Sequence, residues 1–133
     1  MSPTGPLHRA ACPCGSGKPY DACCGRLHRG AAAAVTAEEL MRSRYAADAL
    51  GDLDHLFRTW HPRTRPDELA ANRGLTWTGL TIVSTAGGGP DDETGEVEFR
   101  AAYRTADGAG VLHERSRFAR RAGRWVYVDG DVG

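Results

Sequence analysis

Residues 112–129 read LHERSRFARRAGRWVYVD and contain the pattern that decides the fold. Apolar and aromatic side chains alternate with polar ones on both sides of the Ala122-Gly123 pair, as in two β-strands joined by a tight turn. The same alternation continues upstream as far as Trp77, interrupted by clusters of turn-forming residues. It predicts four strands in an antiparallel sheet, at residues 76–85, 95–105, 110–121 and 123–132.

Upstream of these strands, apolar residues recur with the 3.6-residue period of helices. Thr36 and Glu39 have the spacing of a capping box, in which two side chains satisfy backbone N–H groups at a helix start. A helix is therefore expected to begin at Ala37 and to end at Gly51, because glycine readily adopts the left-handed conformation of a helix end. Helices followed by an antiparallel sheet define an α+β fold.

The remaining upstream elements are shorter. Asp52 is the expected N-cap of a second helix that runs to about residue 59. A third helix is predicted over residues 66–72, with Pro66 at the first helical position. Residues 25–35 show no patterned apolar face and are expected to form a linker or a loosely helical approach to the next element. The chain is therefore predicted to divide into an N-terminal unit of residues 1–30 and a domain of residues 31–133.

One predicted strand has polar side chains on its core-facing side, where Glu114 and Ser116 share a face with Leu112 and Phe118. An unpartnered buried carboxylate costs several kcal/mol, so these residues predict the polar floor of a pocket. Aromatic walls with a few polar groups are the usual composition of a small-ligand cavity. The candidate pocket residues are Trp60, His61, Arg65, Tyr103, Glu114, Ser116, Trp125, Tyr127 and Asp129, the last three on one face of the final strand.

Two interpretations of these residues stay open. In the functional one, His61 is a general base, and Arg65 pairs with Glu114 or binds an anionic substrate. In the structural one, Trp60 fills the space between the helices and the sheet, Arg65 neutralises Glu114 internally, and His61 caps a helix. The two differ in whether the polar candidates converge on an open cavity.

Charge and hydropathy exclude some classes of function. Seventeen basic residues balance seventeen acidic ones, which removes a strong general attraction to nucleic acids or anionic membranes. His113, Arg115 and Arg117 on the outer strand face are expected to be solvated, with nucleic-acid binding as the alternative. Arg42 and Arg44 on the first helix are also expected to be solvated, unless one of them joins the polar network of the pocket. No apolar run has the length of a signal peptide or a membrane span, so we expect a cytoplasmic protein.

All the cysteines, Cys12, Cys14, Cys23 and Cys24, lie close together near the N-terminus. Bridges within each close pair would be strained, whereas crossed disulfides are geometrically open. A reducing cytoplasm favours four thiolates on one metal ion instead. Zn²⁺ suits a closed tetrahedral sulfur site, so we predict one structural zinc ion per chain. A redox sensor is the alternative, which predicts reversible metal release by mild oxidants.

The residues around the cysteines fit such a site. Residues 15–17, Gly-Ser-Gly, can turn the chain tightly and aim backbone N–H groups at the sulfurs. Four thiolates and one divalent cation carry a net charge of about −2. His8 and His28 flank the cluster and are expected to be solvated loop residues. The basic residues close enough in sequence to offset the charge are Arg9, Lys18 and Arg26.

The pattern Cys-x-Cys-Gly-Ser-Gly-Lys-x-Tyr-x-x-Cys-Cys-Gly resembles the SEC-C motif, the zinc-binding tail of the SecA translocase that recurs on many bacterial proteins. The resemblance implies Cys12, Cys14 and Cys23 as zinc ligands, with Cys24 in the fourth position, where that family has His or Cys. It also implies a zinc hook that docks on a protein partner, since the motif is associated with protein partners and, in the translocase, with a chaperone and the ribosome.

Five further segments, taken together, resemble the YchJ family of bacterial proteins: TAEELMRSRY (36–45), TWHPRTRP (59–66), VEF (97–99), LHERSRF (112–118) and GRWVYVDG (123–130). The resemblance implies an NTF2-like cone, in which helices close over a curved sheet and leave a pocket for a small molecule. Such domains often pair through their sheets, which makes a homodimer an expectation. Relatives with this fold include isomerases and dehydratases, so a proton-transfer enzyme is the alternative to a docking protein.

Overall fold

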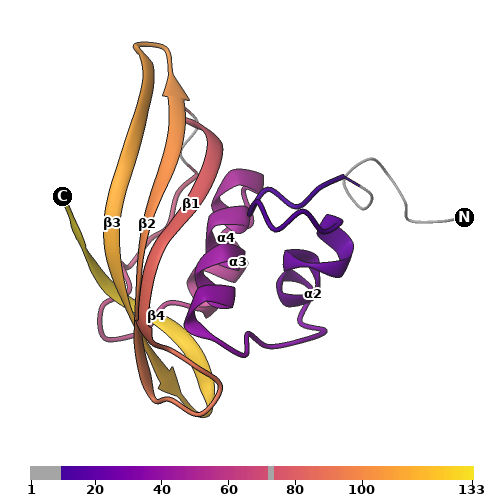
Figure 1. Ribbon diagram of the computed structural model, residues 1–133, viewed down its shortest axis with the longest axis vertical. Coiled ribbons are helices and arrows are strands. Elements are labelled where there is room, and N and C mark those ends of the chain that lie inside the picture. The colour runs from indigo at the N-terminus through magenta and orange to yellow at the C-terminus, as the bar shows by residue number, and fades with distance from the viewer. Residues whose placement is uncertain (1–9, 72–73) are drawn as a thin grey trace, which may run out of the picture.

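The computed structural model describes residues 10–71 and 74–133, which form three layers (Figure 1). A small N-terminal unit, the hook (residues 10–30), packs against a layer of helices, and the helices cover one face of a curved antiparallel sheet. The hook contains the 3₁₀-helix η1 (Tyr20–Ala22) and helix α2 (Cys24–His28). Helices α3 (Ala37–Leu50) and α4 (Leu53–Arg58) follow. The sheet has the order β1-β2-β3-β4, with strands Thr76–Gly87, Thr94–Thr105, Gly108–Arg121 and Arg124–Val132.

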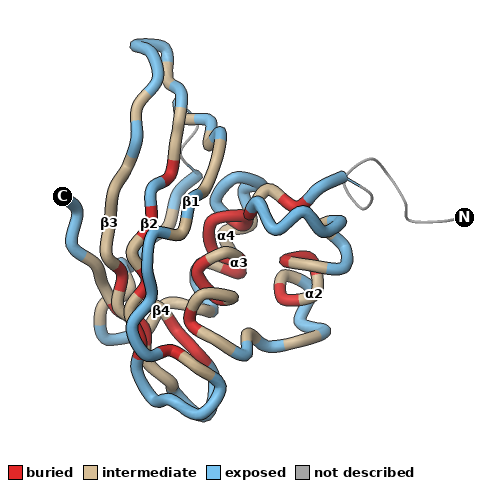
Figure 2. Tube along the Cα trace, in the orientation of Figure 1, coloured by how far each residue is buried: buried red, intermediate tan, exposed pale blue. Residues whose placement is uncertain are grey.

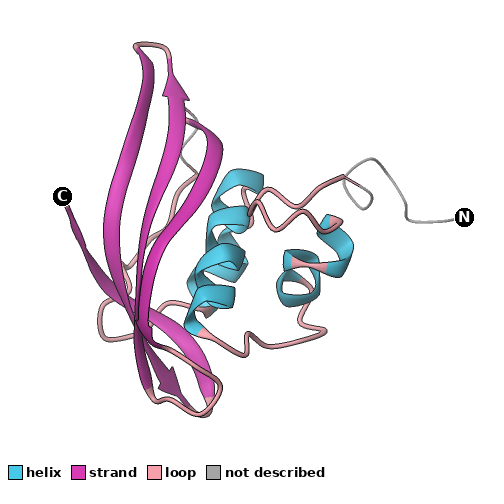
Figure 3. Cartoon of the chain, viewed as in Figure 1, coloured by secondary structure: helices cyan, strands magenta, loops and turns pink. Residues whose placement is uncertain are grey.

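The predicted α+β fold is confirmed, because the helices all precede the strands and lie on one side of them (Figure 3). We call helices α3 and α4 together with the sheet the cone. No helix in the described part of the chain is long and apolar enough to cross a membrane.

Helix α3 begins and ends at the predicted residues. The Thr36 hydroxyl accepts a hydrogen bond from the Glu39 N–H at 3.1 Å, and Gly51 ends the helix with a φ of 78°. The Glu39 carboxylate accepts from the N–H of Val35 at 2.7 Å, one residue earlier than in the usual capping box. Asp52 caps α4 as expected, accepting from the His55 N–H at 3.0 Å.

One prediction for the shorter segments was wrong, and a second was confirmed only in part. Residues 66–71 are not helical, and Asn72 lies outside the described residues. Most of this segment is exposed, so a short helix there would gain no packing to offset the cost of its first turn. The expected linker starts late, because residues 24–28 form α2, and Leu27 in that helix is only 4% exposed.

The main core lies between α3 and the concave face of the sheet, where the buried segments of both face each other (Figure 2). Leu40, Met41 and Tyr45 of α3 pack in one cluster with inward-facing residues of the strands. Those strand residues are Val97, Phe99, Ala101, Phe118 and Trp125. The opposite side of α3 packs on the hook, so this helix is covered on two sides (Figure 1).

A pair of histidines in tilted ring contact joins the hook to the cone. His28 was expected to be solvated, but its side chain is only 5% exposed, and its ring lies 4.6 Å from the ring of His55. The Nε2–H of His28 donates to the backbone carbonyl of Ser43 at 2.8 Å, and its Nδ1 lies 2.6 Å from the Tyr20 hydroxyl. The prediction failed because residues of α3 and α4, distant in sequence, cover this ring. His8 lies outside the described residues.

His55 makes the stability of the protein depend on pH. Its Nε2 lies 2.9 Å from the Ser43 hydroxyl, which donates to the Leu40 carbonyl, and its buried Nδ1 has no hydrogen-bond partner among the described residues. Burial lowers the pKa of His55 from 6.5 to about 3. Between pH 6.5 and pH 3, His55 is therefore protonated in the unfolded chain but neutral in the folded chain. The stabilising contribution is complete above pH 6.5 and is lost progressively as the pH falls towards 3.

We expect this histidine to reduce the free energy of unfolding by about 2 kcal/mol between pH 7 and pH 5. Urea denaturation of the wild-type protein and of His55→Gln at both pH values measures the effect. The glutamine variant, which cannot titrate, should show a pH dependence smaller by that amount. Equal pH dependence in the two proteins would contradict the assignment.

Candidate metal centre and cone cavity

The four cysteines converge on one point of the hook. Cys12 and Cys14 lie before η1, and Cys23 and Cys24 lie where α2 begins, so the turn at residues 15–17 and the short η1 helix bring the two pairs together. Their sulfur atoms all lie within 4.8 Å of one another, and all four cysteines are free. A tetrahedral metal with metal–sulfur bonds of about 2.3 Å requires sulfurs about 3.8 Å apart. The Sγ atoms of Cys14 and Cys23 lie 3.7 Å apart, so the cluster could bind a metal ion.

Hydrogen bonds around the sulfurs show how this site shares negative charge. The backbone N–H groups of Cys14 and Cys24 interact with the Cys12 sulfur, and the Ser16 hydroxyl lies 3.1 Å from the Cys23 sulfur. Hydrogen bonds from the Cys12 and Cys24 thiols lower the pKa of Cys14 far below its usual range. The hydrogen bond to Cys14 raises the pKa of Cys12 to about 11. The pKa values of Cys12 and Cys14 are therefore shifted in opposite directions by the same contact.

The cluster is closed towards the cone. Cys12, Cys14 and Cys24 are buried and pack on Ala46 of α3, whereas Cys23 is partly exposed. This arrangement offers four sulfur ligands, the number that completes a tetrahedral structural metal site.

Two arginines, one from the helix layer and one from the hook, contribute to the cluster's surroundings. Arg42 of α3 donates to the Cys14 carbonyl at 2.7 Å, although the sequence predicted a solvated side chain. Arg26 donates from Nε to the Cys23 carbonyl, and its Nη2 pairs with Glu39 at 2.7 Å. Lys18 is exposed, and Arg9 lies outside the described residues. The contact of Arg42 spans 28 residues, so sequence spacing gave no signal for it.

A second candidate site is a cavity of about 210 Å³ between the helices and the concave face of the sheet. Four of the predicted pocket residues line it: Trp60, Glu114, Ser116 and Tyr127. Glu114 accepts hydrogen bonds at its Oε2 atom, from the Ser116 hydroxyl at 2.7 Å and from the Tyr127 hydroxyl at 3.3 Å. Burial and the nearby Glu114 carboxylate raise the pKa of Tyr127 to about 12, so its hydroxyl stays protonated and can donate.

Arg44 is a cavity residue that the sequence prediction placed in solvent. It is only 8% exposed, and its guanidinium lies 5.0 Å from the ring centre of Trp60 and 4.7 Å from that of Tyr127. Nη1 donates to the Leu56 carbonyl and the Thr59 hydroxyl. Burial lowers the pKa of Arg44 to about 10, so it stays charged at neutral pH. Arg44 follows Leu40 by four residues and Met41 by three, so helix geometry places it on the same buried face as these two residues. This spacing was the signal in the sequence for its burial.

Two of the proposed rim residues lie away from this cavity. The Nδ1 atom of His61 accepts a hydrogen bond from the backbone N–H of Arg63 at 3.0 Å. The backbone N–H of His61 donates to the Tyr127 carbonyl. Arg65 stacks on Phe57, with its guanidinium carbon 3.7 Å from the ring centre. The predicted pairing of Arg65 with Glu114 is therefore wrong, because the aromatic ring holds the guanidinium outside the cone.

Three other candidates have different surroundings from those expected. Tyr103 packs edge-on against Trp77, and the Trp125 indole donates to the Val35 carbonyl at 3.1 Å. The prediction that Asp129 lies on the inner face with Trp125 and Tyr127 was wrong. A β-bulge inserts one extra residue between Tyr127 and Asp129, and this turns Asp129 to the outer face. None of the three lines the cavity.

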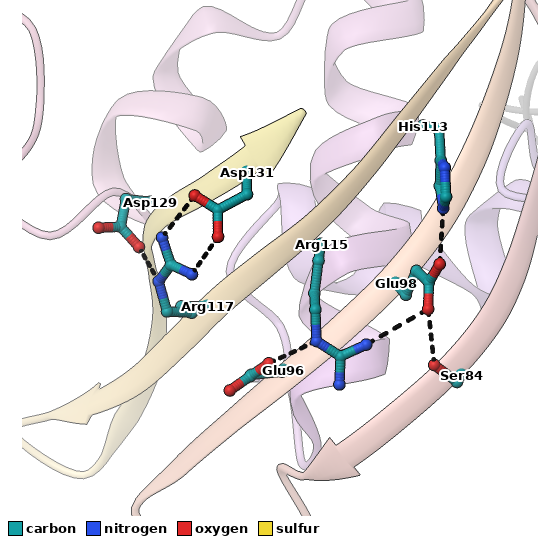
Figure 4. Close-up of polar contacts among 8 residues, drawn as sticks. All are labelled: Ser84, Glu96, Glu98, His113, Arg115, Arg117, Asp129 and Asp131. Carbon is teal, nitrogen blue, oxygen red and sulfur yellow. Dashed lines mark hydrogen bonds and ion pairs between the residues drawn. The ribbon is translucent and has the colours of Figure 1, made fainter. Parts of the chain in front are cut away.

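The outer face of the sheet carries cations that are paired with carboxylates (Figure 4). His113 contacts Glu98 at 2.6 Å, and Arg115 contacts Glu96 at 2.5 Å. Further along, Arg117 bridges two carboxylates, Asp129 and Asp131. This face therefore alternates in charge rather than forming a positive stripe. Dimerisation through it stays a prediction of the family resemblance.

These features define a class of protein: a four-cysteine hook of the SEC-C type on an NTF2-like cone. The SEC-C motif profile matches residues 10–26, and the profile of the YchJ middle NTF2-like domain matches residues 36–130. The chain belongs to the YchJ family, whose members include the UPF0225 proteins.

Relatives support this assignment over nearly the whole chain. A UPF0225 protein of Streptomyces coelicolor is 58% identical over 120 residues, covering 90% of this chain and 94% of the relative. One from Cupriavidus metallidurans is 50% identical over 135 residues, covering 97% and 92%.

Two solved structures have the same fold. The solution structure of a SEC-C motif containing protein from Rhodopseudomonas palustris is 36% identical with a TM-score of 0.80, covering 92% of this chain and 98% of that one. The crystal structure of one from Psychrobacter arcticus is 28% identical with a TM-score of 0.78, covering 96% and 85%.

Proposed function

We propose that the cysteine cluster binds one Zn²⁺ ion per chain and that the metal-ordered hook docks on a protein partner in the cytoplasm. The observation that carries this proposal is the set of four free cysteines whose sulfurs lie within 4.8 Å of one another, with three of these cysteines buried. Four thiolate ligands favour zinc, and a reducing compartment keeps them available for it. A closed site of this kind organises the chain around it rather than performing chemistry.

The surface that the metal would order is the loop at residues 15–19. Its residues are all exposed, and it connects the two ligand pairs. Lys18 stands in this loop, and its backbone N–H donates to the Ser16 hydroxyl, which in turn contacts the Cys23 sulfur. The metal site thus fixes the shape of the loop while leaving its outer side free for a partner.

Capture of cellular proteins on immobilised, zinc-loaded protein tests this docking role. Lys18→Glu reverses the charge of the loop without removing a ligand, and Arg104→Glu makes the same charge change on an exposed position of β2. The amount of specifically captured protein should fall about tenfold with Lys18→Glu, which is the size of effect expected for the loss of one charged contact. Arg104→Glu should capture as much as the wild type. Unchanged capture by Lys18→Glu and by Cys14→Ser would refute docking through the hook.

The cone cavity favours a second candidate function, the binding of a small molecule and its conversion by proton transfer. Glu114 lies at the cavity, and among the described residues only its Oε2 oxygen accepts hydrogen bonds. Asp48 lines the same space. Burial raises the pKa of Asp48. His61 and Asp129 do not line the cavity, so these two carboxylates are the candidates for a proton acceptor.

Thermal-shift screening of small molecules tests this second function. A true cavity ligand should raise the melting temperature of the wild type and of Asp129→Asn, which changes an outer-face carboxylate. It should fail to stabilise Glu114→Gln. A ligand that stabilises all three proteins equally would bind elsewhere.

A further inference from the structure

A cleft of about 290 Å³ outside the cone lies between the end of α4, the segment after it and the β3–β4 turn. Four arginines line it: Arg58, Arg65, Arg121 and Arg124. No carboxylate is among its lining residues in the described part of the chain. We propose that this cleft binds the phosphate groups of a small molecule that carries two or more of them.

Most of the charge of the cleft is uncompensated, unlike that of His113, Arg115 and Arg117 on the outer sheet face. Arg58 pairs with Asp54 at 2.7 Å, through a carboxylate that is largely exposed. Within residues 10–71 and 74–133, no carboxylate lies within ion-pair distance of Arg65, Arg121 or Arg124. A neutral chain thus gathers three unpaired guanidinium groups at one cleft, where their field would attract an anion.

The β3–β4 turn holds two of these cations directly opposite each other. Arg121 and Arg124 are cross-strand partners on either side of Ala122 and Gly123, which both adopt positive φ angles of 53° and 80°. Like charges at paired strand positions destabilise a hairpin. An anion bound between the two side chains removes that repulsion, so the turn gains stability from the ligand.

A third cation is positioned from the other wall. Arg65 stacks on Phe57 and donates from Nη1 to the Phe57 carbonyl at 3.3 Å. These contacts hold the guanidinium at the cleft and leave its other N–H donors without a partner among the described residues. The fork of donors on a guanidinium matches two oxygens of one phosphate group.

Shape and size select the class of ligand. Trp60 and Pro62 add an apolar wall beside the arginines. The volume of the cleft, about 290 Å³, is just below the range for small-molecule sites, which is about 300 to 1,000 Å³. An extended nucleic acid would need a positive path beyond the cleft, whereas Arg115 and Arg117 on the outer face of β3 are paired with carboxylates. The cleft therefore fits a compact phosphorylated molecule better than a nucleic acid.

Calorimetric titration with tripolyphosphate in phosphate-free buffer at 0.15 M salt tests the proposal. The variant Arg121→Gln/Arg124→Gln removes two cations from the cleft. The control Arg100→Gln/Arg104→Gln removes two exposed cations from β2, which also lack a carboxylate partner among the described residues. We expect binding to the wild type, at least tenfold weaker binding to the cleft variant, and a change of less than twofold in the control. Melting curves without ligand verify that both variants fold.

Three outcomes would overturn the proposal. Tripolyphosphate could fail to bind the wild type, or the two double variants could lose affinity equally, which would mean general charge attraction. A single-stranded RNA oligomer could bind much more tightly than tripolyphosphate and lose affinity in the cleft variant. That result would assign the cleft to nucleic acid instead of a small ligand.

Discussion

Chelation of the metal is expected to unfold the hook and to leave the cone folded. The hook buries few apolar side chains, mainly Leu27 and the cysteines themselves, and a unit of this size cannot support a fold without a staple. Metal binding to small zinc peptides contributes about 10 to 16 kcal/mol, which then supplies the folding free energy. The cone has its own core between α3 and the sheet, which contains no ligand residue.

Hydrogen exchange measured by mass spectrometry, with and without chelator, tests this expectation. Exchange in residues 10–30 should accelerate at least about a hundredfold, which corresponds to a loss of roughly 3 kcal/mol of local stability. Exchange in β2 and β3 should change little. Cys14→Ser, which removes the most deeply buried ligand, should reproduce the pattern without chelator. Equal acceleration in the sheet would show instead that hook and cone unfold as one unit, against the predicted boundary near residue 30.

The substitution Gly95→Ala is expected to destabilise the protein by about 3 kcal/mol, because the added methyl group would overlap with the backbone of Gly88. A Cβ at Gly95 would lie 2.4 Å from the Cα of Gly88 and 3.3 Å from the Cβ of Ala37. Gly88 cannot easily move away. Its carbonyl accepts from the Ala37 N–H at 2.9 Å, and its N–H donates to the Thr94 carbonyl at 3.0 Å. The close approach joins the start of α3 to the β1–β2 hairpin.

Urea denaturation of Gly95→Ala and Gly79→Ala provides the matched comparison. Gly79 also lies in the sheet, in β1, but a Cβ there would meet no atom within 4 Å. We expect Gly79→Ala to change the free energy of unfolding by less than about 0.5 kcal/mol. Similar losses in the two variants would show that the general cost of replacing a strand glycine, and not the contact with Gly88, determines the effect.

The sequence by itself was sufficient where neighbouring residues determine the structure. The capping residues Thr36 and Gly51 predicted both ends of α3, since a helix end is satisfied by residues within one turn of it. The alternation of side chains predicted all four strands. The cysteine spacing predicted one cluster, because the ligand pairs are separated by only a short turn and η1.

Tertiary structure alone decided the surroundings of residues that meet across long sequence distances. One bulge moved Asp129 to the outer face, and no local signal marks an extra residue in a strand whose partner sets the register. Phe57 holds Arg65 outside the cone, and His28 is buried by α3 and α4. Local patterns specify which backbone conformation forms, whereas the environment of a side chain depends on which distant elements pack beside it.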